Sequence, residues 1–212
     1  SYSVEVTQLA AAQSLLSPKV GSKDTELGDS SMSTRTLTIT QPGQKDPLTI
    51  TLASDKTSLA DVRDAINAKQ GSVSASIIKA DDNSYYLALT SRDTGTANEM
   101  TITTDDSQLA QYVSYNPSSA TNVMSEQVPA ADAKVNINGI EIVRSSNAIT
   151  DAPEGVTLNL TKTNKGSPET LSIVKDNQPM TDAIQAFVDA YNSLQTTIAN
   201  QTKYTAVDQG ST

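Results

Sequence analysis

The sequence predicts an α+β fold that is mainly β, with two β-rich domains, one inserted into the other, followed by a long C-terminal helix. Apolar residues alternate with polar ones in many short segments, which is the period of half-buried strands. The last segment changes to a helical period. Hydrophobic residues make up 36% of the chain, with no Trp and one Phe, so the predicted cores depend on Val, Ile, Leu, Ala and Tyr.

The first predicted elements are a lone strand, a hairpin and a helix. Tyr2–Leu9 alternates as a strand, and Thr34–Thr40 and Leu48–Leu52 alternate on either side of a turn-rich segment, which predicts a hairpin. Ser58 has the character of a helix N-cap, with an acidic residue three positions later, and Gly71 supplies a stop signal. A short amphipathic helix is therefore expected between them.

A second hairpin and a further strand follow. Val73–Ile77 and Tyr85–Leu89 alternate around a polar turn, Met100–Thr104 reads as a strand, and Gln108–Tyr112 as a single helical turn. The region from about 33 to 127 therefore forms one predicted α+β unit.

The pattern restarts with a hairpin in which Asn138 and Gly139, a dipeptide typical of a type I′ turn, separate two apolar runs. Val156–Leu160 and Thr170–Val174 are further strand candidates. Tyr2–Leu9 has no hairpin partner of its own, so we expect it to join this later sheet. The predicted domains are residues 1–20 plus 128–176, an inserted domain over 21–127, and the start of a helical domain over 177–212.

The final segment predicts a helix that begins near Pro179 and carries an apolar seam. The seam residues recur at alternating spacings of three and four: Ile184, Phe187, Tyr191, Leu194 and Ile198. The chain has no second long apolar helix to cover this seam, which predicts a helical partner elsewhere. Packing of the helix on its own sheet is the alternative, because any amphipathic helix shows similar spacing.

Composition removes several classes of function. The chain has no His and no Cys, which excludes Ser-His-Asp triads, His-based zinc sites, thiolate metal sites and disulfides. A net charge of −9, with no basic run, argues against nucleic acid and anionic membrane surfaces as partners. No apolar stretch reaches the length of a membrane helix. The chain starts without Met and ends after Gly210, which suggests an internal fragment of a longer protein.

The remaining catalytic candidates are weak. Ser76 and Lys79 match an S-x-x-K pattern, but a strand places them on opposite faces. Two acidic clusters, at residues 81–83 and 105–106, lack calcium-loop spacing and read as turns. The Tyr85–Tyr86 doublet could stack on a sugar, but core packing of one ring is the simpler interpretation. We therefore expect no enzyme, no cofactor and no metal site, with a carboxylate-based hydrolase as an alternative.

Three blocks of the sequence resemble the flagellar filament cap proteins, also called hook-associated protein 2. They are Val6–Ser14, Val135–Leu158 and Ala190–Leu194, and they occur in the order and spacing of that family. The resemblance implies two head domains, the variable one inserted, and a final helix that begins a coiled-coil-like leg domain.

The same resemblance implies a function. Such proteins are secreted and form a ring-like homo-oligomeric cap at the distal tip of the extracellular filament, where they retain exported flagellin and promote its polymerisation. The implied partners are further copies of the chain and flagellin. An extracellular adhesin that binds host mucin or glycans is the alternative, suggested by the Ser/Thr-rich β-units, since Ser and Thr form about a quarter of the chain.

Overall fold

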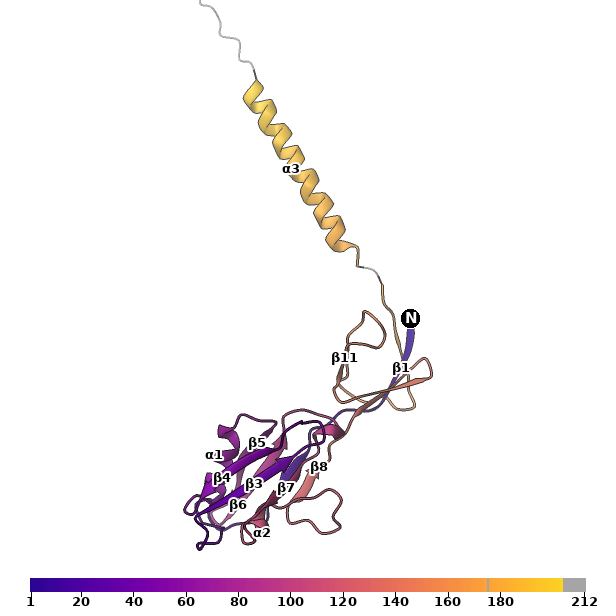
Figure 1. The fold of residues 1–212 in the computed structure, drawn as a ribbon. Helices are drawn as coiled ribbons and strands as arrows, with labels where there is room; N and C mark the ends of the chain where they lie inside the picture. Colours follow the sequence, from indigo (N-terminus) through magenta and orange to yellow (C-terminus); the bar gives the residue numbers. More distant parts are fainter. Residues whose placement is uncertain (175, 204–212) are drawn as a thin grey trace, which may run out of the picture. The chain divides into compact units, whose positions relative to one another are not determined.

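The computed structural model describes residues 1–174 and 176–203 (Figure 1). Residues 2–171 form one compact unit, and the C-terminal helix belongs to another. Within the first unit we distinguish a small module, made of β1 and β9 to β13, and an inserted module, made of β2 to β8 with two helices.

The small module is built on a four-stranded antiparallel sheet with the order β10-β9-β1-β13. Its strands are β1 (Tyr2–Gln8), β9 (Ala133–Ile137), β10 (Ile140–Arg144) and β13 (Glu169–Leu171). Val6 lies opposite Val135 on one side of β1, and Tyr2 lies opposite Leu171 on the other. The prediction that the first strand joins the later sheet is confirmed.

The hairpin between β9 and β10 turns at Asn138 and Gly139, which both have positive φ, as a type I′ turn requires. A two-stranded ribbon, β11 (Ala148–Ile149) with β12 (Leu158–Asn159), completes the module. Its core is small and consists of Val6, Val135, Ile137 and Ile149, with several half-buried neighbours.

The inserted module contains two antiparallel sheets. One has the order β5-β6-β2-β8 and the other β4-β3-β7. Their strands are β2 (Ser14–Leu16), β3 (Thr34–Thr40), β4 (Leu48–Ala53), β5 (Val73–Asp81), β6 (Ser84–Ser91), β7 (Thr101–Thr104) and β8 (Ser125–Val128). Both predicted hairpins, β3–β4 and β5–β6, are confirmed.

The helix after Ser58 starts as the sequence signals predict, but the residue of positive φ just beyond its end is Gln70 and not the predicted Gly71. In α1 (Leu59–Ala68), the Ser58 hydroxyl accepts a hydrogen bond from the Asp61 N–H, as an N-cap should. Leu59, Val62 and Ile66 of α1 enter the main core, which is larger than that of the small module. A short 3₁₀ turn (Thr96–Asn98) and α2 (Ala110–Val113) complete the module.

The structure changes three expectations from the sequence. Strand β2 lies between β6 and β8, so residues 14–16, predicted for the first domain, belong to the sheet of the inserted module. The predicted strands at 156–160 and 170–174 are shorter, being reduced to β12 and β13. Apart from the placement of β2, the division of the chain into domains stays a prediction.

The second unit is dominated by the helix α3 (Gln178–Thr202), which has Pro179 in its first turn, as expected. Side-chain hydrogen bonds between positions i and i+4 link Gln178 to Asp182 and Gln185 to Asp189. The final residues of the predicted helical domain, 204–212, lie outside the described residues.

Candidate interaction surfaces

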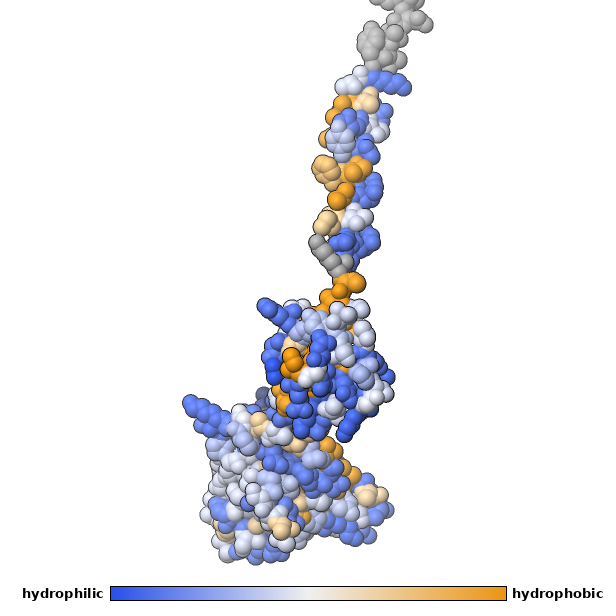
Figure 2. Space-filling model, turned by 90° about the vertical axis from the view of Figure 1, so that its right-hand side faces the viewer, coloured by the Kyte–Doolittle hydropathy of each residue, from blue (hydrophilic) through white to orange (hydrophobic). Residues whose placement is uncertain are grey.

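The predicted apolar seam lies on α3, and all five of its residues are exposed. Their exposed fractions run from 45% for Ile198 to 72% for Phe187, and no described residue of α3 is buried. Figure 2 shows hydrophobic residues exposed along the length of the helix. Because an apolar stripe of this length is unfavourable in water, it is a candidate surface for packing against further helices.

Sequence analysis missed two residues of this surface. Met180 is 56% exposed and lies four positions before Ile184, so it extends the seam by one turn. Val188 is also exposed and lies beside the seam, four positions after Ile184. Extension of the alternating spacing toward Pro179 would have identified Met180.

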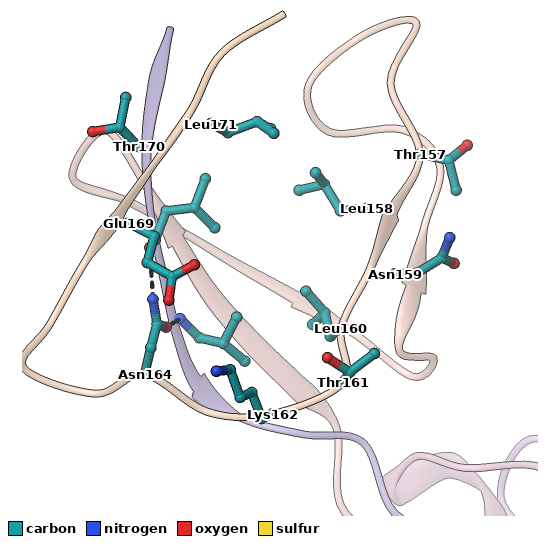
Figure 3. Close-up of a pocket in the computed structure, with 12 residues that line it drawn as sticks. Thr157, Leu158, Asn159, Leu160, Thr161, Lys162, Asn164, Glu169, Thr170 and Leu171 are labelled. Atoms are coloured by element: carbon teal, nitrogen blue, oxygen red, sulfur yellow. Dashed lines mark hydrogen bonds between the residues drawn. The ribbon is translucent and has the colours of Figure 1, made fainter.

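A second candidate surface is a groove of about 380 Å³ in the small module. Its apolar lining comes from Val4, Val6, Leu158, Leu160 and Leu171. In Figure 3, the three leucine side chains point into the space between β12 and the paired strands β1 and β13.

The rim of the groove is polar, and its charged residues are Lys162 and Glu169. Asn164 fixes one end of the groove, because its side-chain amide donates to the carbonyl oxygen of Val4 and accepts from the N–H of Val6. The groove is therefore a formed feature of the small module, with an apolar floor and a polar rim.

The structure places the catalytic candidates in structural roles. Ser76 and Lys79 lie on β5, and the Lys79 ammonium donates to Asp82 at 2.7 Å. The Asn83 N–H and Ser84 hydroxyl donate to Asp81, and these hydrogen bonds lower its pKa. Such hydrogen bonds from an Asp side chain to the following residues are typical of a turn, as predicted for this cluster.

The tyrosine doublet and the acidic residues offer little for ligand chemistry. Tyr85 packs partly against the main core, and Tyr86 is half-buried on β6. Across residues 1–174 and 176–203, no group of three acidic side chains is arranged to hold a metal ion. Within the same ranges, no helix is long and apolar enough to cross a membrane.

The second acidic cluster contains a residue whose role the sequence did not predict. Asp106 is fully buried, and its Oδ2 lies 2.7 Å from the Nε of buried Arg35. Arg35 Nε and Asp106 Oδ2 therefore form a close ion pair, but the N–H of Arg35 Nε is not directed at this oxygen as a hydrogen bond requires. Burial raises the pKa of Asp106, but backbone N–H donors from Leu109, Asp29 and Gln108, together with the charge of Arg35, hold that pKa below its ordinary value.

Comparisons with known proteins agree with this architecture. The model of the flagellar hook-associated protein 2 C-terminus matches residues 130–212, and that of the flagellin hook IN motif matches residues 36–93. Flagellar hook-associated protein 2 of Xenorhabdus nematophila is 43% identical over 99% of this chain and 48% of the relative. The Salmonella typhimurium protein is 46% identical over 87% of this chain and 39% of its own length.

Solved structures show the same similarity. The D1-D2-D3 domains of the flagellar cap protein FliD from Escherichia coli are 40% identical, with a TM-score of 0.86, over 96% of this chain and 56% of that chain. The D2-D3 domains from Serratia marcescens are also 40% identical, with a TM-score of 0.76, over 82% of this chain and 92% of that chain.

The mainly β fold, with its inserted module and terminal helix, is therefore that of the flagellar cap proteins. The chain belongs to the flagellar hook-associated protein 2 family, as the resemblance of its three sequence blocks indicated. It spans about half the length of the Xenorhabdus relative.

Proposed function

We propose that this chain is the head and the first leg helix of a secreted protein that caps the flagellar filament. In this role, copies of the protein assemble into a ring at the distal tip, retain exported flagellin and promote its polymerisation. The observation that carries the proposal is the 40% identity and TM-score of 0.86 to a flagellar cap protein over 96% of this chain.

The exposed seam of α3 supports an assembly role. An apolar stripe that includes Phe187 and Leu194 stabilises a protein only when another surface covers it. The alternating spacing of three and four residues favours a helical partner with coiled-coil-like packing. We propose that further helices of the same longer protein cover the seam.

Complementation of a cap-deficient strain tests the function. The full-length protein should restore filament growth, and Leu194→Asp should reduce it, because the substitution places a charge in the apolar seam. Thr196→Asp is the matched control: it adds the same charge two positions, or about 200°, further round the helix. Failure of the wild-type protein to restore growth would refute the function, and equal growth of the two variants would refute the role of the seam.

The adhesin alternative draws no support from the described residues. Its best candidate for sugar stacking was the Tyr85–Tyr86 doublet, in which Tyr85 packs against the core.

A further inference from the structure

The sheet of the small module has two free edges. In the order β10-β9-β1-β13, strands β10 and β13 each pair on one side only within the described part of the chain. A free edge presents unpaired backbone N–H and C=O groups, which can pair with another strand. The edge at β13 lies beside an apolar groove, and the edge at β10 carries exposed apolar side chains.

The edge at β13 borders the groove. Leu171 of β13 lines it together with Leu158 and Leu160, which approach from the side of β12 (Figure 3). The groove therefore combines an unpaired strand edge with an apolar floor. These are the two features that an added strand with apolar side chains on one face requires.

The edge at β10 carries such side chains. Ile140 is 67% exposed and Ile142 is half-buried, although both belong to the sheet. Ile140 lies opposite Ile137 and Ile142 lies opposite Val135, so both isoleucines are on the core-facing side of the sheet. Leu171 is on this same side, because it lies opposite Tyr2 in the register that also connects Val4 to Ile137.

We propose that β10 of a second copy of this chain adds to the free edge of β13, seats Ile142 in the groove opposite Leu171, and places Ile140 as the diagonal neighbour of Leu171 on the same face. The direction of the strands permits this arrangement. Within one copy, β10 runs parallel to β1 and β13 runs antiparallel to it. A second copy in the same orientation therefore offers β10 antiparallel to β13, and the sheet continues from copy to copy.

Charge supports one register of this pairing. When Leu171 lies opposite Ile142 of the second copy, Glu169 lies opposite Arg144 of that copy, since antiparallel pairs keep a constant sum of residue numbers. Glu169 forms no ion pair among the described residues. Arg144 already binds Asp151 of its own copy at 2.8 Å, and its five N–H donors allow it to bind a second carboxylate.

The contact joins two different edges, so each added copy leaves one β10 and one β13 free at the ends of the assembly. Such a heterologous contact closes into a ring when the rotation between copies permits. The inference rests on the proposed self-assembly and assigns it a specific pair of surfaces in the small module.

Cysteine cross-linking provides a direct test, because the chain contains no Cys. In the register above, Thr170 lies opposite Val143 of the second copy, and both side chains are exposed on the outer face. Within one copy, Thr170 and Val143 lie on opposite edges, separated by three strand spacings of about 4.8 Å, which is too far for a disulfide. Any disulfide between them must therefore join two copies.

Oxidation of the Thr170→Cys, Val143→Cys double variant should give a ladder of covalent oligomers on a non-reducing gel. A mixture of the two single variants should stop at a heterodimer. The matched control pairs Thr170→Cys with Ile78→Cys, a 49% exposed position on edge strand β5, and should give neither product. Dimers of the Val143→Cys variant alone, formed in preference to the heterodimer, would show β10–β10 pairing and overturn the proposal.

Light scattering of the protein without the cysteine substitutions gives a second readout, which is its self-association. Ile140→Glu should weaken self-association about tenfold or more, whereas Ile78→Glu should leave it unchanged. Folding of both variants is checked by circular dichroism. If complementation succeeds but neither cross-linking nor Ile140→Glu has an effect, this interface is wrong while the cap function stands. If complementation fails as well, the proposed function is lost with it.

Discussion

Arg35 is the side chain whose removal we expect to destabilise the inserted module most. It forms a fully buried ion pair with Asp106, and its guanidinium also donates to the carbonyl oxygens of Asp29, Met32 and Ala53. These hydrogen bonds attach the loop before β3 to the end of β4. Arg35→Met retains an unbranched side chain but removes every one of these donors.

The expected cost follows from what the substitution leaves behind. Asp106 would remain buried without its counter-charge, and removal of one partner of a buried pair costs about 3–5 kcal/mol. Three backbone N–H groups still donate to Asp106, which favours the lower end of this range. For a compact unit of the size of residues 2–171, each kcal/mol lost lowers the Tm by about 2–4 °C, so a loss of about 3 kcal/mol lowers it by about 6–12 °C.

Thermal unfolding followed by circular dichroism measures this effect. Arg144→Met is the matched control, because it makes the same change in an ion pair whose side chains are 42% and 59% exposed. Such a surface pair contributes less than about 1 kcal/mol. A Tm for Arg35→Met within the range of the control would refute the account of the buried pair.

Three further predictions concern the inserted module. Gly28→Ala should lower the free energy of unfolding by about 1–3 kcal/mol in urea titrations, because a Cβ there would lie 2.6 Å from Asp106 Oδ2. Ser58→Ala should cost about 1 kcal/mol in the same assay through loss of the N-cap of α1. Burial, and then the charge of Glu126, raises the pKa of Tyr115 to about 12. The stability that the neutral Tyr115 phenol contributes is therefore present below about pH 10 and lost toward pH 12. In unfolding measured against pH, Tyr115→Phe should abolish this loss of stability at alkaline pH.

The sequence predicted elements whose signals are local. The N-cap at Ser58 and the turn at Asn138 and Gly139 depend on a few adjacent residues, and both are present in the structure. The apolar seam of α3 was also predictable, because its period is a property of one segment. What covers that seam is not a local property, and its partner stays a prediction.

The elements that were missed depend on distant pairing. Strand β2 has three residues and exists because β6 and β8 flank it, so the alternation within it is too short to recognise. The buried ion pair joins residues 71 positions apart in the chain. A signal for it was nevertheless present, since Arg35 shares the inward phase of β3 with Leu37 and Ile39. A charge in a core-facing position requires a buried partner.

The structure also shows how the inserted module is connected to the small module. The two chain segments that connect the modules lie side by side. Gln8 pairs with Lys134, Ala11 bridges Ala131, and Ser14 pairs with Val128. The two modules are therefore connected by a pair of antiparallel segments and not by two independent linkers.

Side chains reinforce this connection. Asp132 accepts hydrogen bonds from the N–H and the hydroxyl of Thr96, at 2.9 and 2.8 Å. The amide of Asn147 bonds to both the N–H and the carbonyl oxygen of Ala10. A bend between the modules would have to break several of these contacts together, although relative motion is the usual expectation for linked domains. We therefore expect a contact made by the inserted module to act directly on the sheet whose free edges, β10 and β13, we propose join neighbouring copies.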